Sequence, residues 1–205
     1  RLIVVDEQGR IIDGDRVLCI CGKYLKSRRL LATDKITATV MSNIGLHKHL
    51  KEYGIGVDVT KVGDRYVLES MRETGSVLGG EQSGHMIFLN YTTTGDGVLS
   101  SLQFMKAYLD SGKKLSELRD EIQIYPQALV NARVDNAFKA TALEDEEVKK
   151  FIADIEAKME GTGRVLIRPS GTEPLIRVML EGEDIDEIQG YAKQVAALIS
   201  DKFGK

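Results

Sequence analysis

The sequence predicts a layered α/β domain followed by a smaller α+β domain, and three observations carry this prediction. The chain has 205 residues, enough for one or two domains of roughly 100–200 residues each. Strand-like apolar runs alternate with helix-like segments through residue 122, which is typical of a parallel sheet covered by helices. Pro126 then marks a change of pattern, and the later segments follow the order strand, helix, strand, strand, helix.

In the first part, capping residues and glycines set the helix ends. We expect Ser42 to cap the helix that Gly54 ends, and Gly63 and Gly75 to bound the next helix. The expected elements are a strand–turn–strand over 2–12, helix 15–27, strand 35–41, helix 43–53, strand 57–62, helix 64–75, apolar runs 76–80 and 85–91, and a helix after 97. One face of this last helix carries apolar residues at helical spacing, namely Val98, Leu102, Met105 and Leu109.

In the second part, two amphipathic helices accompany three strands. The apolar face of the first helix carries Val148, Phe151, Ile152, Ile155 and Met159. That of the second carries Ile185, Ile188, Ala192, Val195 and Ile199. The expected elements are strand 128–134, helix 144–160, strands 164–168 and 175–180, and helix 184–203. About 80 residues in this order predict a small α+β domain.

Charge and composition exclude several classes of protein. The net charge is −3 and apolar residues make up 42% of the chain, which is ordinary globular composition. A general nucleic-acid binder needs clustered positive charge, so this class is disfavoured. No apolar stretch approaches the roughly 20 residues that span a bilayer, so we expect no membrane segment. Cys19 and Cys21 would point to different faces of one helix, and as reduced thiols without an export signal they favour the cytoplasm.

The stretch RPSGTEPLIRV, residues 168–178, predicts an anion site. Strand alternation puts Arg168 and Arg177 on the face opposite the core residues, so both guanidiniums can reach one point beside the loop. Ser170 and Thr172 add hydroxyl donors, and Gly171 lets the backbone turn its amides inward. Arginine matches phosphate oxygens with paired hydrogen bonds, so we expect a dianionic phosphate here. The alternative is a hairpin turn with two exposed arginines.

The stretch GGEQSGHMIF, residues 79–88, predicts a second site. Its glycines permit a tight turn from which Glu81, Ser83 and His85 project. A carboxylate beside a hydroxyl can accept and donate hydrogen bonds to sugar hydroxyls. His85 is a candidate for contacting a phosphate or for proton transfer. The alternative is a glycine turn between two strands.

Two other polar stretches favour structural roles. Asp96 in TTTGDG precedes a helix and is expected to cap it. Asp13 and Asp15, in DGDR, resemble a metal loop, but two carboxylates at a turn before a helix usually form the turn and its cap. His47 and His49 are two residues apart on a helix and do not face each other, so a metal site there is disfavoured.

The order GEQSGH, then RPSGTEPLIR about 85 residues later, resembles the α-D-phosphohexomutase family over essentially the whole chain. The stretches VGDRYV and TTTGDG, with the glutamine in GEQSGH, resemble the branch that interconverts glucosamine 6-phosphate and glucosamine 1-phosphate. The resemblance implies a phosphoserine enzyme, a bisphosphate intermediate and Mg²⁺. Branches acting on glucose or mannose phosphates, and a non-catalytic phosphosugar-binding module, are the alternatives.

The resemblance also assigns roles and domains. Glu81 and Ser83 would hold sugar hydroxyls. Asp64 stands where related mannose and glucose mutases often carry histidine, so its carboxylate could bind the amino group of glucosamine. The alternative is that Asp64 caps the helix that begins at Arg65. The distal phosphate would be held by Arg168, Ser170, Gly171, Thr172 and Arg177. Residues 1–30 would end a second domain, residues 31–122 form a domain of the third type that binds sugar, and residues 123–205 form a domain of the fourth type that binds phosphate.

Two family motifs do not occur in this sequence. The phosphoserine loop of the form TASHNP is absent, and of the metal loop DGDxDR only Arg1 could be the last residue. The chain opens without methionine, directly into an apolar run, so we expect a piece of a longer enzyme whose missing N-terminal domains are its partners. This piece is expected to hold phosphosugar without catalysing its isomerisation, and to bind no metal or other cofactor itself. The sequence leaves the oligomeric state open.

Overall fold

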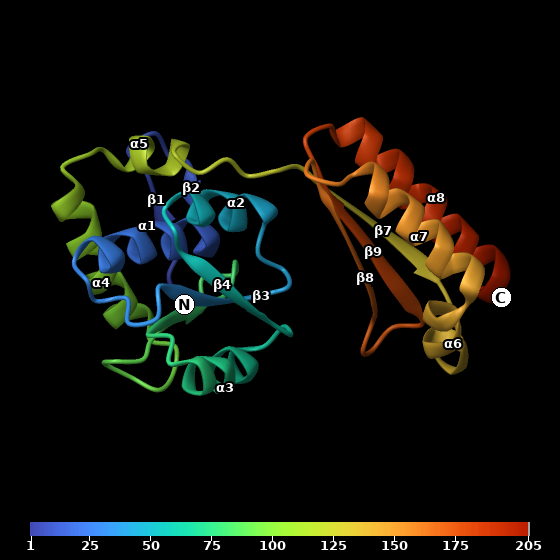
Figure 1. Ribbon diagram of the computed structural model, residues 1–205, viewed down its shortest axis with the longest axis horizontal. Coiled ribbons are helices and arrows are strands. Elements are labelled where there is room, and N and C mark those ends of the chain that lie inside the picture. Colours follow the sequence, from blue (N-terminus) through green and yellow to red (C-terminus); the bar gives the residue numbers. More distant parts are fainter. Residues whose placement is uncertain (205) are drawn as a thin grey trace. The chain divides into compact units, whose positions relative to one another are not determined.

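The computed structural model describes residues 1–204, which divide into two compact units. Unit 1 comprises Arg1–Ile124 and unit 2 comprises Tyr125–Lys205. The division falls two residues beyond the expected boundary at 122/123. Figure 1 shows that each unit has its own sheet and its own helices.

Unit 1 is a three-layered α/β structure. Its main sheet has the order β4-β3-β5-β6, in which β4, β3 and β5 are parallel and β6 is antiparallel to β5. The strands β1 and β2 form a separate antiparallel pair. Helices α1, α2 and α4 lie on one side of this sheet and α3 lies on the other (Figure 1). The elements are β1 (Val4–Val5), β2 (Ile11–Ile12), α1 (Gly14–Ser27), β3 (Lys35–Thr39), α2 (Ile44–Glu52), β4 (Gly56–Thr60), α3 (Asp64–Thr74), β5 (Leu78–Gly80), β6 (Met86–Phe88), α4 (Gly97–Ser111) and α5 (Leu115–Asp120).

Helix α1 lies in the middle of unit 1. Val17 and Leu18 are fully buried in the same cluster as Ile36 of β3 and Leu46 of α2. The expectation that residues 1–30 form a separate remnant therefore differs from the structure. The hydrophobic faces of α1 are covered by the sheet and by α2 and α4, so this helix belongs to unit 1.

Two local expectations for unit 1 differ from the structure. Asn43, not Ser42, caps α2, because its side chain accepts a hydrogen bond from the Gly45 amide. The apolar face expected on α4 faces solvent instead of the core. Its residues are exposed by 74% for Val98, 60% for Leu102, 48% for Met105 and 69% for Leu109. Phe104 and Ala107 are the α4 residues that pack into the core.

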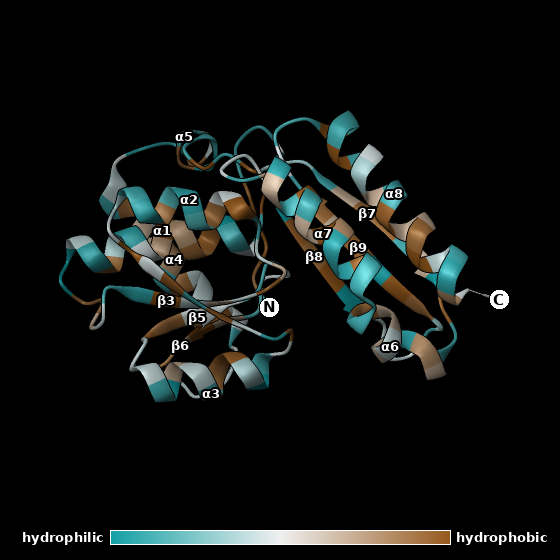
Figure 2. Ribbon diagram, turned by 45° about the vertical axis from the view of Figure 1, so that its right-hand side comes forward, coloured by the Kyte–Doolittle hydropathy of each residue, from teal (hydrophilic) through white to brown (hydrophobic). Residues whose placement is uncertain are grey.

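Unit 2 is a small α+β structure, as the sequence predicts. Its antiparallel sheet has the order β7-β9-β8, and helices α7 and α8 pack on one face of it. The strands are largely hydrophobic, and hydrophobic and hydrophilic residues alternate along α7 and α8 (Figure 2). The elements are β7 (Gln127–Arg133), the 3₁₀ turn η1 (Asn136–Phe138), α6 (Lys139–Glu144), α7 (Glu146–Lys158), β8 (Arg164–Pro169), β9 (Leu175–Glu181) and α8 (Ile185–Phe203).

Helix α6 is the element of unit 2 that the sequence pattern did not indicate. It has six residues and follows η1 directly, so it is too short to show helical periodicity. Across residues 1–204, none of the helices is both long and apolar enough to cross a membrane.

Candidate functional site

The two arginines of the 168–177 loop (Arg168 to Arg177, joining β8 to β9) stand directly opposite each other. Strand register pairs Arg168 with Arg177, so both side chains lie on the same face of the sheet. Ile167 and its partner Val178, and also Ile176, turn to the opposite side and belong to the core of unit 2, whereas Pro169, the partner of Ile176, is exposed. Like charges facing each other across strands repel, so an anion placed between them would be attracted by both.

The backbone of this loop offers donors on its outer side. The Ser170 amide donates to Leu175 O at 2.9 Å, and the buried Ser170 hydroxyl oxygen accepts from the Glu173 amide at 3.2 Å. In the described chain the Gly171 and Thr172 amides and the Thr172 hydroxyl have no protein partner. Free amides beside two guanidiniums are the donor set of an anion site.

The turn at Gly171 does not use the left-handed backbone that favours glycine. Its φ does not lie in the left-handed region, and a Cβ built on it meets nothing within 4 Å. The chain's own geometry therefore does not require glycine here. The position borders open space, which leaves room for a ligand to approach the backbone closely.

Lys139, the first residue of α6, holds the loop from its inner side. Its ammonium group donates to Ser170 O at 2.7 Å and also to Glu173 O. The peptide group between Ser170 and Gly171 is trans, so binding of Ser170 O by Lys139 directs the Gly171 amide away from this lysine. No sequence pattern points to Lys139, because it lies about 30 residues before the loop on a short helix without clear periodicity.

One arginine of the loop already has an acidic neighbour. Arg177 forms an ion pair with Glu173 at 2.9 Å, and the Glu173 side chain is 54% exposed. An incoming anion would compete with this carboxylate for Arg177.

The 79–85 loop (Gly79 to His85, between β5 and β6) is a tight hairpin in which hydrogen bonds fix the position of the Glu81 carboxylate. Glu81 accepts hydrogen bonds from the Gly63 amide at 3.0 Å and from the Ser83 hydroxyl at 3.3 Å. Gly84 has φ 86°, and a Cβ there would come within 2.2 Å of Leu2 O, so this position requires glycine. Glu81 and Ser83, both expected site residues, therefore lie side by side.

Helix α1 supports this loop from behind. The Gly14 amide donates to Gln82 O at 2.9 Å, and a Cβ on Gly14 would come within 2.1 Å of Glu81 O. The close approach of helix and loop requires glycine at position 14. This support fixes the loop backbone and leaves the side chains of Glu81 and Ser83 to face outward.

Asp64 lies beside His85 in the first turn of α3. The N-cap position of α3 is Gly63, with φ 130° and no side-chain cap, one residue before the cap expected at Asp64. The Asp64 carboxylate accepts from the Arg65 amide at 2.9 Å, so it still binds a free amide at the start of this helix. The Asp64 carboxylate is 3.7 Å from His85 Nε2, an atom without a hydrogen-bond partner in the described residues. The two side chains border a hollow of about 240 Å³ that Thr93 and Thr94 also line.

The other acidic stretches have the structural roles expected of them. Asp13 caps α1 through the Arg16 amide, and Asp96 caps α4 through the Val98 and Leu99 amides. Asp15 is buried and accepts from the Asn43 amide at 2.8 Å. Within residues 1–204 no group of three His, Cys, Asp or Glu side chains is arranged to hold a metal ion.

Comparison with known proteins identifies two family models that match this chain. The model "Phosphoglucomutase/phosphomannomutase, alpha/beta/alpha domain III" matches residues 13–125. The model "Phosphoglucomutase/phosphomannomutase, C-terminal domain" matches residues 129–198. The first begins immediately before α1, in agreement with the packing of that helix in unit 1.

Curated relatives extend beyond this chain. A phosphoglucosamine mutase of Streptococcus gordonii is 52% identical over 204 residues, which are 100% of this chain and 45% of the relative. A phosphoglucosamine mutase of Thermoanaerobacter pseudethanolicus is 54% identical over 203 residues, again 45% of its length. The chain thus spans less than half the length of these relatives.

Solved structures share the fold at low sequence identity. An Aspergillus fumigatus N-acetylphosphoglucosamine mutase, in complex with GlcNAc-6P and magnesium, matches with TM-score 0.77 and 19% identity over 97% of this chain and 46% of that one. A phosphoglucomutase/phosphomannomutase family protein from Burkholderia thailandensis matches with TM-score 0.72 and 22% identity over 98% and 45%.

Proposed function

Since this chain belongs to the phosphoglucomutase/phosphomannomutase family, we propose that it is the substrate-holding part of a phosphoglucosamine mutase. The parent enzyme would interconvert glucosamine 6-phosphate and glucosamine 1-phosphate through a phosphoserine enzyme and a bisphosphate intermediate. Relatives of this name that are more than half identical over the chain support the choice of branch. Phosphosugar and the remaining domains of the parent would be its partners.

The cross-strand pair of Arg168 and Arg177 is the observation that carries this proposal. The two guanidiniums would bind the substrate phosphate that is not being transferred, and the amides of Gly171 and Thr172 would bind its remaining oxygens. Ser170 and Thr172 would contribute their hydroxyl groups. Interactions with a non-reacting group orient the substrate, and this orientation can lower the barrier for the group that does react.

The 79–85 loop would hold the sugar. Glu81 would accept hydrogen bonds from two neighbouring hydroxyls, and Ser83 would exchange its bond to Glu81 for one to the substrate. Asp64, with 62% of its side chain exposed, would attract the ammonium group of glucosamine. His85, beside Asp64, would contact a phosphate oxygen or move a proton to or from the substrate.

The chemistry of phosphoryl transfer would lie in other parts of the parent enzyme. Mg²⁺ would stabilise charge on the transferring group there, with Arg1 adjoining its loop. The residues described in this chain do not fit a metal, since they contain no ligand cluster, so we derive no step through it. We expect the 205-residue chain alone to bind phosphate and to show no mutase turnover. The two cysteines are buried and free, which supports the proposed cytoplasmic location.

Substitution of Arg177 in the full-length enzyme tests the proposal. Arg177→Ala should weaken productive phosphosugar binding by roughly 2–4 kcal/mol, because a charged partner of the phosphate is lost. Arg177→Lys should recover only part of this, since lysine lacks the paired donors. Kinetics of both variants, read beside their melting curves, measure the effect. Wild-type kinetics in Arg177→Ala would favour the alternative of a simple hairpin.

A further inference from the structure

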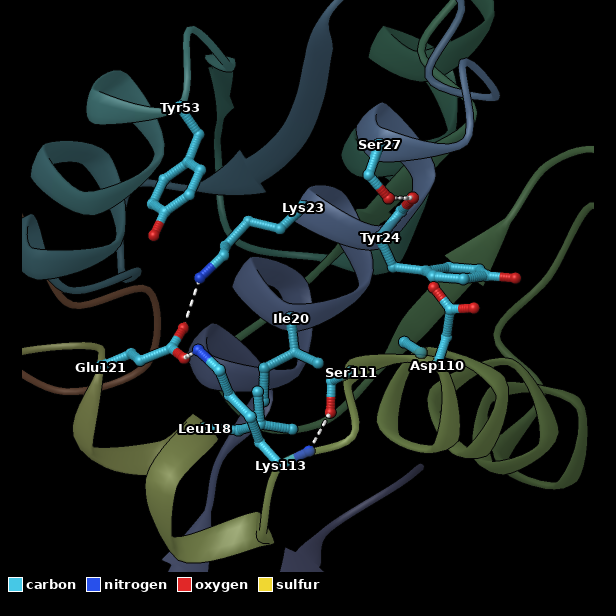
Figure 3. A pocket seen from close by; sticks show the side chains of 11 residues that line it. Ile20, Lys23, Tyr24, Ser27, Tyr53, Asp110, Ser111, Lys113, Leu118 and Glu121 are labelled. Carbon is cyan, nitrogen blue, oxygen red and sulfur yellow. Dashed lines mark hydrogen bonds and ion pairs between the residues drawn. The ribbon is translucent and has the colours of Figure 1, made fainter.

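A cavity of about 300 Å³ lies in unit 1, away from the 79–85 loop (Figure 3). Residues from the C-terminal part of α1, from α4 and from α5 line it, together with Tyr53 after α2. The 79–85 loop contacts α1 at Gly14, whereas the cavity reaches Ser27 at the other end. The lining on α1 begins at Ile20, six residues and so roughly 9 Å along the helix from Gly14, and none of the lining residues belongs to the 79–85 loop. The cavity is therefore separate from the proposed sugar site. Its volume is at the lower end for small-molecule pockets.

The walls of the cavity are mainly apolar, with two aromatic rings. Ile20, Ala107 and Leu118 supply aliphatic surface. Tyr24 and Tyr53 stand on different sides of the opening, as Figure 3 shows. Flat aromatic groups pack well against tyrosine rings and aliphatic side chains. The lining therefore suits a small ligand with a flat apolar body.

Two ammonium groups in the cavity share a single carboxylate. Figure 3 shows Lys23 and Lys113 both directed at Glu121, and each Nζ is 2.5 Å from one of its oxygens. Lys23 also lies 4.2 Å from the centre of the Tyr53 ring. Burial acts to raise the pKa of Glu121, but the two lysines together lower it below its ordinary value, so this carboxyl stays ionised.

The remaining acid of the lining is neutralised from outside the cavity. Asp110 forms an ion pair with Arg28, which does not line the cavity. The lining itself holds two lysines and two carboxylates, and because Arg28 pairs with Asp110 from outside, one positive charge of the two lysines is left unbalanced. A ligand with one negative charge would balance it and would accept hydrogen bonds from both lysines.

We propose that this cavity is a second binding site of the chain, for a small aromatic monoanion. The aromatic body lies against Tyr24 and Tyr53 on the aliphatic floor, and the anionic group meets Lys23 and Lys113. This site goes beyond the proposed mutase function and does not depend on it, because none of its residues belongs to either loop.

Binding of naphthalene-2-sulfonate to the 205-residue chain, followed by amide chemical shifts in NMR, tests this site. Shift changes should gather at residues lining the cavity in α1, α4 and α5. Lys23→Met and Lys113→Met should each weaken binding about tenfold, since a charge-assisted bond is lost. Lys106→Met is the matched control, because this exposed lysine of α4 does not line the cavity, and its affinity should equal that of wild type.

A substitution that removes a negative charge from the cavity should have the opposite effect on affinity. Glu121→Gln removes the carboxylate that competes for both lysines, so it should strengthen binding of the sulfonate severalfold. The neutral analogue 2-naphthol should show no such gain. Unchanged affinity in Lys23→Met, Lys113→Met and Glu121→Gln, with each variant retaining a folded spectrum, would overturn the proposal, as would shift changes confined to the exposed face of α4.

Discussion

The 168–177 loop and the 79–85 loop are both hairpin loops, but they present opposite groups to a ligand. In the first, strand register faces Arg168 with Arg177, and the amides between them are left without protein partners in the described chain. In the second, the carboxylate of Glu81 is held by Gly63 and Ser83. The 168–177 loop therefore presents hydrogen-bond donors and suits an anion, whereas the 79–85 loop presents a hydrogen-bond acceptor and suits hydroxyl groups.

The glycines of the two loops should respond very differently to substitution. Gly84→Ala should destabilise unit 1 by about 3 kcal/mol, because φ is positive and a Cβ would collide with Leu2 O. Gly171→Ala should change the free energy of unfolding by less than about 0.5 kcal/mol, since its Cβ meets nothing. Denaturant unfolding of both variants measures the difference. Equal losses of stability would contradict the different backbone requirements of the two loops.

Lys139→Met should weaken phosphate binding by about 1 kcal/mol, or roughly fivefold, because two loop carbonyls lose their shared donor. Lys139→Arg should restore part of the affinity. Lys150→Met, on the surface of α7, serves as control. Phosphate titration of the three variants, read beside their melting curves, separates positioning of the loop from general stability. An affinity equal to wild type in Lys139→Met would show that the loop needs no such support.

Glu173→Gln should have a smaller effect on phosphate binding than Lys139→Met, and it should act in the opposite direction. Exposed ion pairs contribute about 0.2–1 kcal/mol, so release of Arg177 from Glu173 should strengthen phosphate binding by about 1.4- to fivefold. Isothermal titration with inorganic phosphate measures it. Weaker binding in Glu173→Gln would mean that Glu173 orients Arg177 for the ligand and does not compete with it.

The sequence predicted what depends on local pattern. The strands flanking Arg168 and Arg177, and the caps at Asp13 and Asp96, follow from alternation and capping chemistry. Lys139 could not be predicted, since its contact with the loop depends on how a short helix packs. The exposed apolar face of α4 was unpredictable for a related reason. Helical periodicity reports that one face is apolar, and packing decides which face is buried.

The most direct test of the central claim, that the 168–177 loop alone forms an anion site, is an NMR titration of this chain with inorganic phosphate. The amide signals of Gly171 and Thr172 should move with saturating phosphate, while those of Gln82 and Ser83 stay in place. Binding should be weak, because free phosphate lacks the sugar contacts that would offset its lost freedom. The same titration of Arg168→Ala and Arg177→Ala should show much smaller changes. Stationary Gly171 and Thr172 signals in the wild-type chain, or equal movement in both loops, would contradict the claim.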